Sequence, residues 1–407
     1  MKRMICIALM MCFGLSTIND LQAQSVSDPA TFAFDIRLGR MRDGEMMSSP
    51  AMAGMMNQPG AMGPGMSPSD IDRVFGAVAL PNDMATFEVF NQPQPPAELP
   101  MNFFARIELA NASVGDTMWA DISGSPGVSE EVINGTTYLA NEGEMTNILV
   151  QRINDVTIEI ATRDFVQAGI GRELFSPGLT DAWGKVPDHA LRLAIDLQGE
   201  AQLVSEVIAM AKQDPSIDPM SSAYLDLVDN AANVRFSFDP DDTILLQLAA
   251  TGVDASQAEE LRSGIDAALG IAKMGGTAAL NMAENNPEAD EMTAMLLSDP
   301  NMMSAARGIL GSLSAKSEGN EVMVTIPRPD GFTEAVSSLM EVLPMMMMGG
   351  MGGPPPGDFG PGDFGPGDFG PGDFDQFEEG GDLFGGSSPV EAAPFGGGEE
   401  GDPFGGG

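Results

Sequence analysis

The residue types that most often carry chemistry are sparse in this chain or lack a diagnostic spacing. His189 is the single histidine among 407 residues, so a histidine-based catalytic triad or a multi-histidine metal site is hard to build. It stands where a loop enters a predicted strand, which favours a structural role. Asp and Glu are abundant, but no cluster of them has a spacing that reveals acid/base geometry. The sequence therefore favours a protein that is not an enzyme, with a carboxylate-dependent hydrolase as one alternative.

Three aspartates and one glycine cluster come nearest to known ligand motifs. Asp239, Asp241 and Asp242 could offer oxygens to calcium, but the Asp-x-Asp-x-Asp-Gly pattern and the distal Glu of a calcium loop are missing. We interpret them as the acids of a hairpin turn. The glycines of 349–353 are followed by prolines, without the lysine or helix start of a phosphate-binding loop. No cofactor is expected from these patterns.

Methionine is the unusual chemical resource of the chain. Eight methionines fall in 41–66, at spacings such as Met52, Met55 and Met56. Soft thioethers on a flexible loop could bind copper(I). These three residues are therefore the candidate metal ligands, and a methionine-rich copper(I)-binding protein is the second alternative. Methionine also occurs where it is typical of core filler, as at Met210, which weakens the case for a metal site.

The N-terminus has the parts of a secretory signal peptide. Lys2 and Arg3 precede an apolar run over 4–15, and a polar stretch ends at Ala23. The apolar run is about a dozen residues long, whereas a membrane anchor needs about 20. We therefore expect cleavage near Ala23 and an extracytoplasmic mature protein, either periplasmic or secreted.

Removal of the signal peptide leaves a strongly acidic chain without cysteine. Cys6 and Cys12 both lie in 1–23, and Met11 before Cys12 does not fit a lipoprotein signal. The remainder has 17 basic and 58 acidic residues, a net charge of −41. Nucleic acids and anionic membranes are poor partners for such a chain. No later stretch reaches the roughly 18 apolar residues of a membrane span.

Composition and hydrophobic period divide the rest of the chain. We predict an α+β fold of antiparallel sheets covered by helices, with disordered segments. The predicted segments are a first strand region at 24–39, a flexible Met/Gly/Pro-rich loop at 40–68, a first α+β half at 69–188, a second α+β half at 189–348 and a disordered Gly/Pro/Asp/Phe-rich acidic tail at 349–407.

The chain is organised around a predicted hairpin that leads into a long helix. Apolar residues alternate in 234–238 and again in 244–251. Ser256 with Glu259 predicts a capping box at the start of a helix over 256–273. The apolar stripe of this helix should lie on the apolar face of the hairpin.

The same layered arrangement extends to other predicted elements. Strands at 103–109 and 191–197 and the central hairpin should bury their apolar faces under the central helix and a helix at 200–213. Further elements are predicted as a strand at 31–38, a short helix from Ser69 through Phe75, a strand at 86–90, a helix near Ser113, a hairpin with Asn134-Gly135 as its turn, strands at 148–153 and 156–160, a helix at 223–229, helices that break at Gly275-Gly276, Pro287 and Pro300, a strand at 321–326 and a helix at 333–343.

The order strand, helix, strand pair occurs in both halves. The first set begins at 103–109, and the second begins at 191–197 and ends with the central hairpin. This order predicts a diverged internal duplication of a strand-helix-strand-strand unit. The prediction rests on a pattern of elements and not on matched residues.

The end of the chain, 354–407, has the composition of a disordered interaction segment. It has 12 acidic residues and no basic one, and Gly-Pro-Gly-Asp-Phe recurs with a period of five up to Phe374. Charge repulsion should keep it extended, while its phenylalanines could make weak multivalent contacts with a protein partner. The sequence does not identify that partner.

Four segments carry a resemblance to a known group of proteins: Asp72–Gly76, Ala182–His189, Leu227–Asn233 and Ala258–Gly264. In the region that these segments span, the chain resembles uncharacterised exported proteins of planctomycete-type bacteria. The resemblance implies a signal peptide and a shared α+β body, and it implies no activity and no functional residues. We therefore expect an exported acidic protein that binds or scaffolds a partner without catalysis, with the copper(I)-binding protein and the hydrolase as alternatives.

Overall fold

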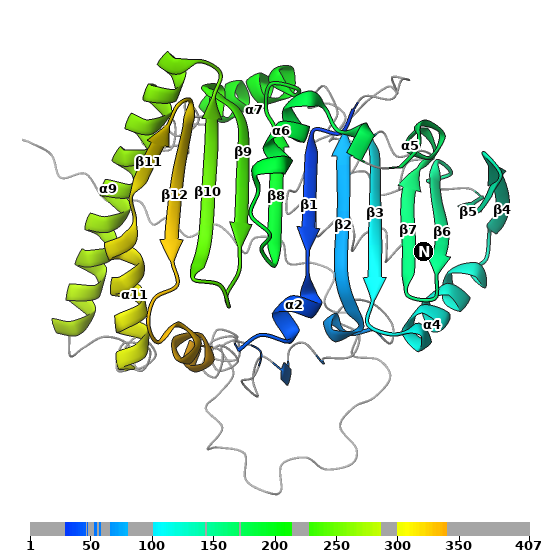
Figure 1. The fold of residues 1–407 in the computed structure, drawn as a ribbon, viewed down its shortest axis with the longest axis horizontal. Helices are drawn as coiled ribbons and strands as arrows, with labels where there is room; N and C mark the ends of the chain where they lie inside the picture. The colour runs from blue at the N-terminus through cyan, green and yellow to red at the C-terminus, as the bar shows by residue number, and fades with distance from the viewer. Residues whose placement is uncertain are drawn as a thin grey trace, which may run out of the picture. The chain divides into compact units, whose positions relative to one another are not determined.

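The described part of the chain contains a single antiparallel sheet of twelve strands (Figure 1). The computed structural model describes residues 29–45, 47, 53–54, 57, 66–79, 101–142, 145–170, 172–213, 228–285 and 299–339, which all belong to one compact unit. The strand order is β11-β12-β10-β9-β8-β1-β2-β3-β7-β6-β5-β4. The predicted α+β class with antiparallel strands is confirmed, and both predicted halves share one sheet.

The described elements have the following bounds. The strands are β1 (Phe32–Ile36), β2 (Ile71–Ala79), β3 (Asn102–Leu109), β4 (Val128–Ile133), β5 (Thr136–Asn141), β6 (Ile148–Asn154), β7 (Thr157–Thr162), β8 (Leu191–Asp196), β9 (Ala231–Phe238), β10 (Ile244–Gly252), β11 (Ala315–Glu318) and β12 (Glu321–Pro327). The helices are α2 (Leu38–Arg42), η2 (Pro68–Asp70), α4 (Ala112–Ser123), α5 (Arg163–Ala168), η4 (Arg172–Leu174), α6 (Pro177–Lys185), α7 (Ala201–Gln213), α9 (Ala255–Asn285) and α11 (Pro300–Ser312).

β1 lies at the centre of the sheet and joins its two halves. It pairs with β2 on one side and with β8 on the other, both times antiparallel. The strand pairs of the two halves lie at different places: β9 and β10 follow β8 directly, whereas β7 and β6 separate β3 from the β5-β4 hairpin. This strand order gives no support to the predicted duplication, which stays a prediction.

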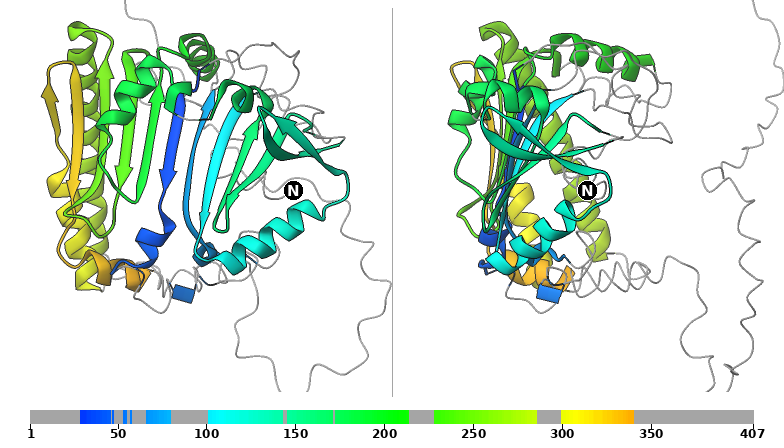
Figure 2. Two further views of the ribbon diagram at one scale, coloured as in Figure 1. Left: turned by 45° about the vertical axis from the view of Figure 1, so that its right-hand side comes forward. Right: turned by 90° about the vertical axis from the view of Figure 1, so that its right-hand side faces the viewer.

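Helices cover both faces of the sheet. The face toward the viewer in Figure 1, here called the front face, carries α5 and α6, which bury Phe165, Leu179 and Trp183 against Ala33 and Phe104. α4, α7, α9 and α11 lie behind the sheet, on what we call the back face (Figure 2). The two faces therefore have separate cores, because each strand alternates its side chains between them.

α4 packs on the back face at β3 and shares one core with side chains of β1, β2 and β7. The strand residues of this core, such as Val74 and Ile107, are buried together with Met118 and Ile122 of the helix. α4 begins at a capped end, since the Asn111 side chain accepts a hydrogen bond from the amide of the helix's third residue. This helix, and not the two that the sequence predicted, covers the apolar face of the strand at 103–109.

A glycine in β2 permits one close contact in this core. A Cβ atom on Gly76 would lie 2.6 Å from the Phe34 ring and 2.5 Å from the carbonyl oxygen of Phe104. The Phe34 ring therefore lies directly over Gly76, and a larger residue would force the ring or the strand to move.

The predicted hairpin at Asn134-Gly135 is confirmed. Both residues have positive φ, 52° and 81°, as a type I′ turn requires. The strand pair predicted at 148–153 and 156–160 is also confirmed, as β6 and β7. Local signals were sufficient at these places because a short turn fixes which residues pair.

The helix predicted from Ser69 through Phe75 is wrong. Only the single turn η2 is helical there, and β2 begins at Ile71 and pairs with both β1 and β3. The pairing shifts register between Ile71 and Arg73, so the alternation of apolar residues is interrupted at the start of the strand. Pairing on both sides decides the structure over this weak local signal.

The helix break predicted at Gly275-Gly276 is also wrong, because α9 continues to Asn285. Gly276 faces α11, and a Cβ atom there would lie 2.6 Å from the Leu310 side chain. The glycine therefore allows α9 and α11 to approach closely and does not end the helix.

The start of α9 differs from the predicted capping box. The Asp254 side chain accepts a hydrogen bond from the Gln257 amide at 2.9 Å, and the helix begins at Ala255. Asp254 is thus the capping residue in place of Ser256.

Other differences concern the limits of elements. Leu38, predicted as the end of a strand, begins α2, which continues to Arg42 in the predicted flexible loop. The sequence predicts no element at α5, α6 or β11, and the helix predicted at 333–343 is helical over 332–339 within the described residues. The strand predicted at 86–90, most of 40–68, most of the helix at 223–229 and the acidic tail lie outside the described residues.

Candidate binding face

Polar side chains occupy the front face of β8 and β9, and they are buried. Arg192 lies opposite Ser237, and Ala194 lies opposite Arg235. α6 packs over these strands and places the Trp183 ring 4.6 Å from the Arg192 guanidinium group, a distance that allows a cation–π contact. The polar front face of β8 and β9 is therefore buried inside the protein.

One buried carboxylate holds three arginines at the centre of the sheet. The Asp35 side chain on β1 is 0% exposed. Its oxygens accept hydrogen bonds from Arg73 at 2.7 Å, Arg37 at 3.1 Å and Arg192 at 3.4 Å. Since guanidinium groups occupy both oxygens, Asp35 is suited to a structural role and not to proton transfer. The ion pairs also cross the junction between the two halves.

Asp188 extends this cluster into solvent. Its carboxylate accepts hydrogen bonds from Arg37 at 2.6 Å and from Arg192 at 3.3 Å. The hydrogen bond from Arg37 is the largest cause that lowers the pKa of Asp188, and the same bond raises the pKa of Arg37. The segment before β8 is thereby held to the end of β1.

A second ionic cluster attaches α2 to the turn between β9 and β10. Arg40 Nη2 lies 2.7 Å from Asp239 Oδ2, and Asp241 Oδ1 accepts a hydrogen bond from the Glu45 amide at 2.9 Å. The aspartates lie in the turn, as predicted. Asp239, however, is buried and not in solvent.

His189 is buried beside the same turn. Its Nε2 atom lies 4.0 Å from Asp242 Oδ2. The pKa of Asp242 is lowered mainly by a hydrogen bond from the Ile244 amide, with further contributions from Thr243 and His189. This surrounding is that of a residue that helps to fix the turn.

The back face of β8, β9 and β10 is apolar and incompletely buried. The pairing registers align its side chains in two rows that continue onto β12. The first row is Leu193, Phe236, Leu248 and Val324, and the second is Leu191, Phe238, Leu246 and Ile326; we call these eight residues the apolar rows. Val324 is buried, Leu248 is 37% exposed, and the other six are half-buried.

The neighbouring row of the back face is covered. Val234, Ala250 and Val322 pack with Leu261 of α9, which confirms the predicted contact between the central helix and the hairpin. The helix covers this row only. The prediction that 191–197 and the hairpin bury their whole apolar face is therefore wrong for the apolar rows.

α9 has an exposed apolar surface of its own. It contacts α11 through Gly276, whereas Ile271, Met274 and Met282 lie on the opposite side of the helix by its period of about 3.6 residues. Met274 is 68% exposed and Met282 is 67% exposed. These three residues form an exposed apolar strip along one side of α9.

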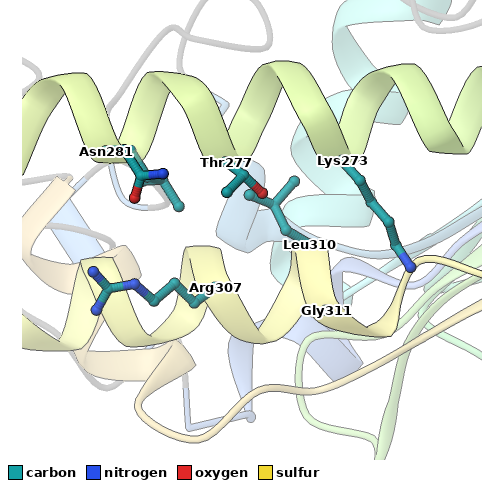
Figure 3. Close-up of a pocket in the computed structure, with 7 residues that line it drawn as sticks. Lys273, Thr277, Asn281, Arg307, Leu310 and Gly311 are labelled. Atoms are coloured by element: carbon teal, nitrogen blue, oxygen red, sulfur yellow. The ribbon is translucent and has the colours of Figure 1, made fainter.

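A groove of about 280 Å³ lies between α9 and α11 (Figure 3). It is lined by Lys273, Thr277, Leu280 and Asn281 from α9 and by Arg307, Leu310 and Gly311 from α11. Figure 3 shows Lys273 extended toward the C-terminal end of α11, where a cation interacts favourably with the helix dipole. Lys273 thus has a structural role at the end of α11, and we do not choose this groove as the candidate binding site.

The predicted metal ligands Met52, Met55 and Met56 lie outside the described residues, so copper(I) binding stays a prediction. Within the described part of the chain, no three His, Cys, Asp or Glu side chains are placed to hold a metal ion together. In the same part, no helix is both long and apolar enough to cross a membrane. The hydrolase alternative also stays a prediction.

Sequence reasoning missed the ionic clusters, although a signal was present. Alternate residues of neighbouring strands have charges of opposite sign, as with Glu159 and Arg106 at 2.7 Å and Asp35 with Arg192. Charged residues inside several predicted strands, such as Arg106, Glu159 and Arg192, were that signal. It becomes readable only with the strand order, because the partners are far apart in the sequence.

No protein-family model and no curated protein matches this chain. Two solved structures of TP0453 are similar at a low level. Crystal form III has a TM-score of 0.30 and 10% identity and covers 78% of this chain and 99% of TP0453. Crystal form I has a TM-score of 0.28 and 9% identity over 77% and 98%. This likeness carries no argument about function, so the function has to be inferred from the apolar rows.

Proposed function

We propose that this chain is an exported, non-enzymatic binding protein whose apolar rows receive an apolar partner outside the cytoplasm. The observation that carries the proposal is the burial of β8 and β9. Arg192, Arg235 and Ser237 are buried, whereas Phe236 and Phe238 remain half-buried. A purely structural strand pair would place its aromatic residues in the core and its charged residues in water.

The ionic clusters support binding by making the face rigid. Asp35 connects β1, β2 and β8 through its arginines, and Arg235 lies 2.5 Å from Glu321 of β12. A rigid surface loses little conformational entropy when a partner covers it. The free energy of binding then comes mainly from burying the apolar area that is still exposed, at about 25 cal/mol per Å².

The proposed location follows from the N-terminal segment. The charged start, the apolar run and the small residue Ala23 support export of a mature chain that begins near Gln24. Mass spectrometry of the N-terminus of the protein recovered outside the inner membrane tests this part. An intact 1–23 segment on the mature protein would contradict it.

Binding of an uncharged fluorescent dye tests the apolar rows directly. We expect Nile red to bind the mature protein and to lose much of its fluorescence with Leu248→Ser, because this residue is the most exposed of the rows. The matched control is Val132→Ser, which makes a comparable change at a residue 66% exposed on the edge strand β4. Equal dye binding by both variants, with unchanged thermal unfolding, would contradict the proposal.

A further inference from the structure

We infer that the protein self-associates through α9, whose exposed apolar strip pairs antiparallel with the same strip of a second copy. This surface is separate from the apolar rows, so the inference goes beyond the proposed function and does not rest on it. It is carried by the distribution of charge and of side-chain size along one side of the helix.

The exposed strip of α9 is longer than its three largest members. Residues three or four positions apart lie on the same side of a helix, and two exposed alanines continue the row in this way. We call the resulting five residues the α9 strip: Ala267, Ile271, Met274, Ala278 and Met282. The helical rise makes the strip about 22 Å long. α9 lies at the β11 end of the sheet (Figure 1), where a second molecule can reach its outer side.

The two halves of α9 differ in polarity on this side. In the first half the same side carries Ser256, Glu260 and Ser263, all exposed. From position 267 to 282 the sequence has no acidic residue and a single charged one, Lys273, although the chain has 59 acidic residues. Lys273 extends toward α11 and not along the strip (Figure 3). Exposed apolar residues that gather on one uncharged side of an acidic protein mark an interaction surface.

The sizes of the side chains favour a second copy as the occupant. In an antiparallel pair of identical helices, residues at equal distances from the two-fold axis lie at the same level. With the axis directly after Met274, Ala267 lies level with Met282 of the second copy. Ile271 then lies level with Ala278 of the second copy. Each large side chain therefore meets a small one, which allows the helices to pack closely.

The residues at the axis fit the same arrangement. Met274 of the two copies would meet there, beside Gly275, whose Cβ position has open space around it. A two-fold interface requires that one surface be complementary to itself, and the α9 strip meets this condition. It has no charge that would select a basic or an acidic partner, and the acidic chain would be repelled by an anionic lipid surface.

The expected dimer is weak and strengthened by salt. The short strip buries less than the roughly 800 Å² per partner of a standard interface, so we expect a dissociation constant above about 1 μM. The acidic bodies of the two copies repel each other, and added salt screens this repulsion without weakening the apolar contact. Tighter association at higher salt distinguishes this dimer from one held by ion pairs.

Sedimentation of the full mature chain, at concentrations up to about 0.5 mM, tests the association. Met274→Lys should weaken dimerisation at least about tenfold, because two lysines would meet at the axis. Met274 is 68% exposed, so thermal unfolding of the monomer should be unchanged. The matched control is Val132→Lys, at a residue 66% exposed on the edge strand β4, and it should leave association unchanged.

Disulfide crosslinking tests the antiparallel arrangement. Cys6 and Cys12 lie in 1–23, so the mature chain offers a thiol only where one is introduced. With diamide as oxidant, Met274→Cys should crosslink to its own copy, since a disulfide joins Cα atoms within about 7 Å. Met282→Cys should not, because its two copies would lie about 22 Å apart along the helix. Mixed with Ala267→Cys, it should crosslink.

Each other result has a definite meaning. A monomer at every concentration, or a dimer that Met274→Lys does not weaken, would overturn the inference. Crosslinking of Met282→Cys to its own copy as fast as that of Met274→Cys would overturn the antiparallel pairing. Binding to phosphatidylcholine vesicles that Met274→Lys removes, without dimerisation, would identify a lipid surface as the occupant. Dye binding that depends on Leu248 tests the proposed function separately, so the two can fail independently.

Discussion

On the back face of the sheet, β2, β3 and β7 bury their apolar side chains, whereas β8, β9 and β10 leave those of the apolar rows only partly buried. Ile107, Ile158 and Ile160 are buried in the first region, but Phe236 and Leu248 of the second are not. Both regions belong to one sheet and have the same alternating pattern. The strand pattern thus defines an apolar face, and the helices that lie over it decide whether that face is core or surface.

The front face also differs between the two regions, in the polarity of its buried side chains. Beside β7 and β3 it is built mainly from apolar residues such as Phe104 and Ala161, whereas beside β8 and β9 it contains Arg192 and Arg235. Charged residues can be buried there because each has a partner across the strands. The second region therefore has ionic contacts on its buried front and partly exposed apolar side chains on its back.

The largest effect is expected from the carboxylate that joins the two regions. Asp35→Asn should lower the free energy of unfolding by about 3–5 kcal/mol, because it removes the negative charge that three arginines share in a buried place. Urea unfolding measures the loss. The matched Asp181→Asn removes an exposed pair with Lys185 and should cost below about 1 kcal/mol. Similar losses for both variants would show that the central cluster adds little stability.

A core truncation in the first region should rank second. Ile158 is 1% exposed, so Ile158→Ala is expected to cost about 2–5 kcal/mol through lost burial and the cavity that remains. Ile153→Ala on the neighbouring strand makes the same change at a residue 43% exposed and should stay within about 0.5 kcal/mol. Thermal unfolding of both variants checks the difference, and a small loss for Ile158 would place it outside the core.

The sequence predicted the elements that neighbouring residues determine, and it missed those that depend on contacts between distant parts of the chain. The Asn134-Gly135 turn, the β6-β7 pair and the central hairpin are correct because neighbouring residues determine them. The sequence predicts a helix at the start of β2 because a register shift after Ile71 interrupts the alternation of apolar residues. Its identity depends on pairing with β1 and β3, which come from separate parts of the chain.

The candidate site was beyond reach of the sequence for a related reason. Alternation in 234–238 identified an apolar face, but the sequence did not reveal that α6 would cover the opposite, polar face. The partners of Asp35 include Arg192, 157 positions away, so their contact depends on the strand order. The apolar rows are a property of four strands together, and no single strand predicts their exposure.

A substitution at the junction beside β1 should have an intermediate effect. Gly76→Ala is expected to cost about 1–3 kcal/mol, because its Cβ would press on the Phe34 ring and on a backbone oxygen. Gly184→Ala in α6 has open space around its Cβ and should instead stabilise by up to about 1 kcal/mol, through the higher helix propensity of alanine. Denaturant unfolding distinguishes the two signs, and no loss for Gly76→Ala would contradict the close contact.

A truncation in the apolar rows should have little effect on the stability of the free protein. Leu248→Ala is expected to cost about 1 kcal/mol or less, since the side chain is already 37% exposed. Measured beside Ile158→Ala, it tests the comparison of the two regions most directly. A loss as large as that of Ile158→Ala would mean that the rows belong to the core, and the binding proposal would then lose its basis.

The smallest effect concerns the pH dependence of the contact between Asp188 and Arg37. The pKa of Asp188 is lower in the folded chain than its ordinary value near 4. Its contribution to stability is therefore fully present above about pH 4 and is lost as the pH falls through the lowered, folded-state pKa. Because Asp188 is largely exposed, the contribution is small and has to be measured against Asp188→Asn. The difference in unfolding midpoint between the two proteins should shrink from neutral pH to about pH 3. A difference that stays constant over this range would show that Asp188 titrates alike in the folded and unfolded chains, and the segment before β8 would then need another anchor to β1.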